Sequence, residues 1–128
     1  MSPSPSGKNS SGERKSRGTD AENFRKLHIA LEKLKVGVWT QHSNIVGLSE
    51  AWYRFFEIMY GDIFLLEDYV RLIDDPKDRK RVWGFRDIFH QNPPGTLWED
   101  TFSLAGKRVH SRAFITEDGT LFGVDILE

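Results

Sequence analysis

The sequence predicts an α+β fold in which short helices cover one face of an antiparallel sheet. The strongest observation is a meander of three strands, at residues 97–104, 107–116 and 120–127. The intervening segments, 105–106 (Ala-Gly) and 117–119 (Glu-Asp-Gly), are typical hairpin turns. The second observation is a central region in which apolar residues recur at helical spacing between turn signals. Two short strand candidates precede that region and bring the expected sheet to five strands.

Composition indicates one soluble domain. The chain has 128 residues, a net charge of −1, nine Phe and four Trp, which is enough aromatic material for a core. It has no cysteine, and this excludes disulfides and thiolate metal sites. The near-zero charge gives no general attraction to nucleic acid. No apolar run approaches the roughly 18 residues of a membrane span, and no signal peptide is recognisable, so we expect a cytoplasmic protein.

The first twenty residues differ in composition from the rest. Residues 1–20 are rich in Ser, Gly and Pro, lack aromatic residues and carry four basic side chains. Such a segment buries too little apolar surface to offset its ordering entropy, which predicts a disordered leader. A basic tail that binds RNA or a membrane is the alternative.

An amphipathic helix is predicted at residues 21–35. Thr19 and Glu22 have the spacing of a capping box. Four apolar residues then follow at intervals of three and four, as in a coiled-coil seam. The helix either lies on its own domain or forms the seam of a homodimer. The seam residues are Phe24, Leu27, Leu31 and Leu34.

The middle of the chain is predicted to alternate short strands and helices. Strands are expected at residues 36–41 and 45–48, and helices after Ser49, at 67–73 and at 78–91. The apolar residues of the first and last of these helices predict their buried faces. They are Trp52, Phe55, Phe56 and Met59, and Val82, Phe85, Ile88 and Phe89.

Four short motifs in this order resemble a PAS domain. They are residues 37–39 (Gly-Val-Trp), 48–52 (Leu-Ser-Glu-Ala-Trp), 75–79 (Asp-Pro-Lys-Asp-Arg) and the terminal Asp125-Ile126. The resemblance covers residues 36–128 and implies a five-stranded antiparallel sheet of order 2-1-5-4-3. The family usually ends Asp-Ile-Thr-Glu, whereas this chain ends Asp-Ile-Leu-Glu.

The resemblance implies a sensor module. Such a domain detects a small ligand or a partner and relays the change to an output domain, of the histidine kinase or diguanylate cyclase type. We expect that output domain to be covalently linked in a parent protein, because the last strand ends the chain. This chain carries no P-loop, nucleophile elbow or other catalytic motif, so it is not expected to be an enzyme.

No coloured cofactor is expected. The flavin and coumaroyl photosensors of this family need a cysteine, and the haem-binding members carry a histidine where this chain has Val82. His90 lies eight residues further on, and no histidine pair has metal-ligand spacing. An unidentified small molecule is the remaining ligand class. The expected pocket residues are Trp39, Phe55, Val82, Phe85, Asp100, Ser111, Ala113 and Val124.

The two C-terminal hairpins predict a row of charges across the sheet. If Ser103 pairs with Arg108 across a four-residue loop, Arg112 lies opposite Glu99. If Thr116 pairs with Leu121, Arg112 also lies opposite Asp125. Such a row could relay strain to the end of the last strand, or it could simply solvate the outer face of the sheet.

Two other classes of protein stay open. One is a cone-shaped domain of the nuclear-transport-factor type, a small enzyme or carrier with a buried carboxylate base. For that role Asp100 is the strand acid expected to point inward. The other is a ligand-free module that only holds two chains together.

Overall fold

The computed structural model describes residues 6–128, and their side chains from Asp20 onward. The chain divides into two compact units, Met1–Lys33 and Leu34–Glu128, which are described separately. The first unit contains one helix, α1 (Ser6–Lys33). The predicted helix at 21–35 lies within α1 up to Lys33, after which Lys35 adopts φ 60°. Residues 1–5 of the predicted leader lie outside the described residues, and 6–20 belong to α1.

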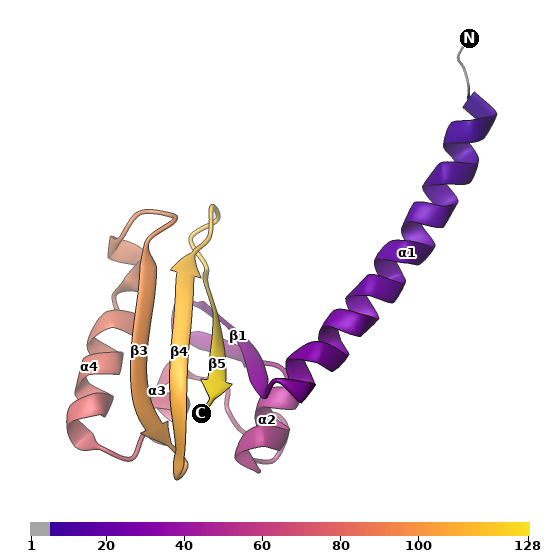
Figure 1. The fold of residues 1–128 in the computed structure, drawn as a ribbon. Helices are drawn as coiled ribbons and strands as arrows, with labels where there is room; N and C mark the ends of the chain where they lie inside the picture. The colour runs from indigo at the N-terminus through magenta and orange to yellow at the C-terminus, as the bar shows by residue number, and fades with distance from the viewer. Residues whose placement is uncertain (1–5) are drawn as a thin grey trace. The chain divides into compact units, whose positions relative to one another are not determined.

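The second unit is built on a five-stranded antiparallel sheet of order β2-β1-β5-β4-β3, which confirms the predicted order (Figure 1). Strand β1 pairs with β2 on one side and with the last strand, β5, on the other. The remaining strands follow as a meander. The strands are β1 (Val36–His42), β2 (Ile45–Leu48), β3 (Leu97–Leu104), β4 (Lys107–Ile115) and β5 (Leu121–Leu127).

Three short helices and a 3-10 turn connect β2 to β3 and cover one face of the sheet (Figure 1). The Ser49 hydroxyl caps the first helix by accepting from the Trp52 amide, as predicted. Asp75 caps the third, with Pro76 at its first position. These elements are α2 (Glu50–Phe56), α3 (Leu66–Val70), α4 (Pro76–Arg86) and η1 (Phe89–Gln91).

Two of the predicted buried positions are wrong because the helices are shorter than predicted. Helix α2 ends where Glu57 turns left-handed (φ 56°), so Met59 leaves the buried face and is 75% exposed. Helix α4 ends at Arg86, and Ile88 is 43% exposed. The buried residue of this last turn is Arg86 itself, which the apolar pattern did not predict.

The predicted register of the β3–β4 hairpin is confirmed, and its predicted loop is wrong. Glu99 lies opposite Arg112. However, the pairing continues inward by one pair and leaves a two-residue turn, in which Ala105 and Gly106 have φ of 50° and 81°. Positive φ at both positions is characteristic of the type I′ turn, which matches the twist of a hairpin.

The predicted register of the β4–β5 hairpin is wrong by one residue. The Thr116 amide donates to the Thr120 carbonyl (2.8 Å), and the three-residue loop between them ends with Gly119 at φ 82°. A bulged loop of this kind has one residue fewer than the predicted loop. As a result Leu121 pairs with Ile115, and not with Thr116.

This shift places Asp125 on the opposite face of the sheet from the predicted one. Arg112 lies opposite Val124, and Asp125 lies opposite Ser111. Because side chains alternate between the two faces, a slip of one residue turns Asp125 from the outer face into the core. Its exposure is 1%. The predicted row of Glu99, Arg112 and Asp125 therefore does not exist.

Candidate functional site: a polar cluster in the core

The candidate site is the buried carboxylate of Asp125, on the inner face of β5. One oxygen accepts hydrogen bonds from the Trp39 indole (2.9 Å) and the Ser111 hydroxyl (2.6 Å). The other accepts from the Trp52 indole (3.0 Å) and the Tyr69 hydroxyl (2.7 Å). We call these five residues the Asp125 cluster.

The cluster joins elements that are far apart in the sequence. Trp39 comes from β1, Trp52 from α2, Tyr69 from α3 and Ser111 from β4. All three large donors are nearly or fully buried, with exposures of 1% or less. The carboxylate of the last strand is thus bonded to two neighbouring strands and to two helices that cover the sheet.

Two glycines allow the indoles to approach the sheet. A Cβ on Gly123 would lie 2.4 Å from the Trp39 ring, and a Cβ on Gly37 would lie 2.7 Å from the Trp52 ring. Any larger residue at these positions would displace the indoles. The Gly-Val-Trp and Gly-Val-Asp segments therefore work together, because their glycines make room for the donors that Asp125 needs.

The hydrogen bonds to Asp125 use both of its carboxylate oxygens. A carboxylate offers about four acceptor positions, and all four are taken by donors. Among the described residues, the cluster therefore satisfies the Asp125 carboxylate inside the core with neutral donors and without an ion pair.

The corresponding positive charge is Arg86, the last residue of α4, which is fully buried. Its guanidinium lies 3.8 Å from the centroid of the Trp39 ring and 4.3 Å from that of the Tyr69 ring. The Nε group donates to the Gln41 side chain (2.8 Å), and the Gln41 amide donates back to the Arg86 carbonyl (2.8 Å). Arg86 and Asp125 thus share two aromatic neighbours but do not touch.

The two terminal nitrogens of Arg86 are buried and make no hydrogen bond of good geometry among the described residues, but the Tyr69 side chain lies near enough to the guanidinium for a hydrogen bond between them to raise the pKa of Arg86. The guanidinium meets Tyr69 through the face of its ring, while the Tyr69 hydroxyl points to Asp125. Asp125 has no free acceptor position for Arg86. We call the two terminal nitrogens the Arg86 fork.

Burial shifts the pKa values of Tyr69 and Arg86. Burial raises the pKa of Tyr69 well above its usual range, and the negative charge of Asp125 raises it further. Burial lowers the pKa of Arg86, although its neighbours Tyr69 and Asp125 partly offset this loss. Tyr69 therefore stays a neutral donor under ordinary conditions.

The predicted pocket residues fall into three places. Trp39 and Ser111 belong to the Asp125 cluster. Val82 and Ala113 are buried in the apolar core, Phe55 packs at its edge, and Phe85 stacks on Trp98 at 5.4 Å. Asp100 lies at the rim, where both its oxygens bind Arg81 at 2.9 Å. Val124 lies on the outer face.

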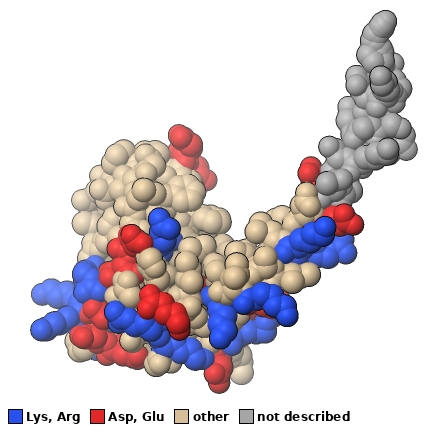
Figure 2. All heavy atoms as spheres, viewed as in Figure 1, with Lys and Arg blue, Asp and Glu red and all other residues tan. Residues whose placement is uncertain are grey.

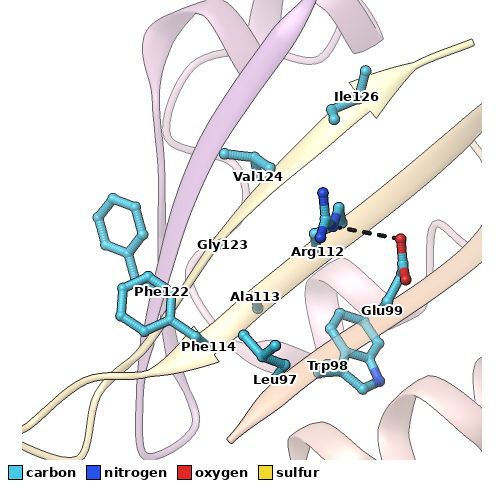
Figure 3. Close-up of a pocket in the computed structure, with 10 residues that line it drawn as sticks. All are labelled: Leu97, Trp98, Glu99, Arg112, Ala113, Phe114, Phe122, Gly123, Val124 and Ile126. Carbon is cyan, nitrogen blue, oxygen red and sulfur yellow. Dashed lines mark ion pairs between the residues drawn. The ribbon is translucent and has the colours of Figure 1, made fainter. Parts of the chain in front are cut away.

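The outer face carries a shallow groove of about 330 Å³, lined by side chains of β3, β4 and β5 (Figure 3). Its apolar part includes Leu97, Phe114 and Phe122, which are 77%, 43% and 38% exposed. At one end Arg112 pairs with Glu99 at 3.4 Å, and Glu99 also contacts His110. Figure 2 shows that most charged side chains on this face gather away from the apolar part.

Sequence reasoning missed two residues of the Asp125 cluster and the buried Gln41–Arg86 pair beside it. Tyr69, Trp52, Gln41 and Arg86 were not among the predicted site residues, and Asp125 was placed on the wrong face. An available signal was the two glycines beside strand aromatic residues, because close packing of an indole requires glycine on the neighbouring strand. No pattern would have indicated that a basic residue near the end of α4 is buried.

Several further features bear on the class of protein. No group of His, Asp or Glu side chains that could hold a metal ion occurs among the described residues. Over the same part of the chain, no helix combines the length and the apolar character that crossing a bilayer requires. No family model matches the sequence, and no curated protein matches it significantly.

Proposed function

We propose that this chain is a sensor module of the PAS type, which detects a small ligand or partner and relays it to an output domain of the kinase or cyclase type. The observation that carries the proposal is the Asp125 cluster. Asp125 lies two residues before the end of β5, and its carboxylate is bonded to α2, α3, β1 and β4. A rearrangement among the helices would therefore change the bonding of the last strand.

The sheet order and the short helices on one face support the PAS assignment, because they match what the four sequence motifs imply. The buried charges support sensing. Burying the charged Arg86 costs free energy, and buried groups with shifted pKa values are found most often where a site has a function. In this proposal the chain itself catalyses no reaction, and the output domain belongs to the parent protein.

A homodimer is the second part of the proposal. In α1, Phe24 and Leu27 are 62% and 53% exposed, and Leu34 just beyond it is 68% exposed. Exposed apolar side chains at this spacing are suited to pairing with a second copy. The same feature would serve a ligand-free dimerisation module, which is the alternative function.

The experiment that separates these functions combines native mass spectrometry with a matched pair of variants. A sensor should co-purify with a small molecule or bind one, and Asp125→Asn in the parent protein should alter output activity. Asp62→Asn is the control, because Asp62 is exposed and outside the cluster. A folded Asp125→Asn protein with unchanged output, together with a ligand-free dimer, would favour the dimerisation module.

A further inference from the structure

Arg86, the last residue of α4, contacts two of the side chains that donate to Asp125. Its guanidinium lies 3.8 Å from the centroid of the Trp39 ring and 4.3 Å from that of the Tyr69 ring. The polar group of each ring in turn donates to the Asp125 carboxylate, at 2.9 Å and 2.7 Å. The Trp52 indole donates to the same carboxylate but makes no contact of this kind with Arg86 among the described residues. Arg86 thus contacts one part of the cluster and not all of it.

From this arrangement we infer that Arg86 is a positioning residue for Asp125, because it holds Trp39 and Tyr69 in place as donors. The inference rests on the proposed sensor function and adds a route to it. The four hydrogen bonds join β5 to α2, α3, β1 and β4, whereas no side chain of α4 bonds Asp125 among the described residues. Through Arg86, the end of α4 controls the hydrogen bonding of the last strand without touching its carboxylate.

Two physical effects make a buried cation important for these donors. A cation is attracted to the electron-rich face of an aromatic ring, and the attraction is stronger where water is excluded, as it is around the fully buried Arg86. A positive charge beside a ring also polarises its N–H or O–H group, and a polarised donor makes a stronger hydrogen bond. The second effect appears in the pKa of Tyr69, which burial and the charge of Asp125 raise and the charge of the Arg86 fork lowers. Loss of the cation should therefore loosen both rings and weaken both donors.

The cation is fixed to the end of α4. The Nε group of Arg86 donates to the Gln41 side chain, and the Gln41 amide donates back to the Arg86 carbonyl, both at 2.8 Å. Because one residue binds both the guanidinium and the backbone of Arg86, the two parts move together. A displacement of the last turn of α4 therefore shifts the guanidinium relative to the Trp39 and Tyr69 rings, and this chain of contacts carries the change to β5.

The test follows the exchange of two indole N–H groups with solvent by NMR in the whole chain. Arg86→Met keeps much of the length of the side chain and removes its charge. We expect the Trp39 indole to exchange at least about tenfold faster in this variant, and the Trp52 indole to change by less than about twofold. Arg86→Lys keeps the charge and should recover part of the protection of the Trp39 indole.

Arg81→Met is the matched control, because Arg81 lies on the same helix and its exposed side chain binds Asp100; it should leave both indoles unchanged. If Arg86→Met does not fold, exchange of the wild type in increasing denaturant decides. The Asp87 amide, whose hydrogen bond to the last turn of α4 measures 2.8 Å, should exchange through the same opening as the Trp39 indole. An equal change of both indoles in Arg86→Met, no change of either, or an opening that exposes Asp87 and keeps Trp39 protected would overturn the inference.

These failures differ from a failure of the proposed function, because the exchange rates are measured on this chain without an output domain. Altered output in Asp125→Asn, together with an equal change of the two indoles in Arg86→Met, would keep the sensor and remove α4 from the relay. An unchanged output in a folded Asp125→Asn protein would remove the sensor itself, whatever the exchange of the Trp39 indole.

Discussion

Tyr69 connects the two buried charges through different parts of one side chain. Its hydroxyl donates to Asp125 at 2.7 Å, and its ring lies 4.3 Å from the Arg86 guanidinium. An ionised tyrosine could not donate to a carboxylate and would add a second negative charge to the core. The folded protein therefore needs the neutral phenol, and this need makes its stability depend on pH.

Stability should decrease above about pH 10, where an unfolded tyrosine loses its proton. The folded-state pKa of Tyr69 is raised, so folded Tyr69 keeps its proton when the unfolded chain releases it. Its contribution is fully present below the unfolded pKa and is lost as pH rises toward the folded pKa. The loss from this one group amounts to about 1.4 kcal/mol per pH unit.

Urea denaturation at pH 9, 10 and 11 measures this slope. Tyr69→Phe should be less stable near neutral pH, by about 1–2 kcal/mol for the lost hydrogen bond. It should also lose the extra alkaline slope. Tyr60→Phe is the control, because Tyr60 is 69% exposed, and it should keep the slope. Equal slopes in the wild type and Tyr69→Phe would contradict the assignment.

At the scale of elements, the packing of β1 against β5 depends on glycine. A Cβ at position 123 would lie 2.4 Å from the Trp39 ring and 2.8 Å from the Arg112 carbonyl. The second contact is with a backbone atom, which cannot move away by a change of rotamer as a side chain can. The indole would have to leave Asp125, and the strands would have to separate.

Gly123→Ala should therefore destabilise the protein by more than about 2 kcal/mol. Gly84→Ala is the matched control, because Gly84 is exposed in α4 and a Cβ there would meet nothing within 4 Å. Alanine is the better helix former, so that variant should gain about 0.5–1 kcal/mol. Chemical denaturation of both proteins measures the difference, and a neutral Gly123→Ala would show that the indole can be repositioned.

The strands and helices also show what the sequence can and cannot predict. Alternation of apolar residues and strong turn signals predicted all five strands, because those signals are local. The order of the strands in the sheet was predicted by the resemblance to a PAS domain. The β4–β5 register depended on whether the loop had three or four residues, which the Glu-Asp-Gly segment does not determine. That single residue decided whether Asp125 faces solvent or core. Burial of Arg86 depends on aromatic rings from β1 and α3, so no local pattern carries it.

At the scale of the whole molecule, two exposed apolar surfaces are candidate sites for the proposed self-association. One is the stripe of α1, formed by Phe24, Leu27 and Leu31, with Leu34 just after the helix. The other is the outer groove of the sheet, with Phe114 and Phe122 in its apolar part. Full burial of each such side chain contributes about 1.5–3 kcal/mol, so either surface could support a dimer.

We expect the α1 stripe to form the dimer, because its side chains project from a helix with the spacing of a coiled-coil seam. Deleting residues 1–35 removes the whole stripe and ends just before β1, so the sheet should still fold. Light scattering should then show a monomer, whereas the full chain should be a dimer. Phe122→Glu in the full chain places a charge in the outer groove, and it should leave the dimer intact. Phe64→Glu is its control, since Phe64 is exposed outside the groove. The opposite pattern, a truncated dimer and a monomeric Phe122→Glu, would assign the interface to the outer face of the sheet.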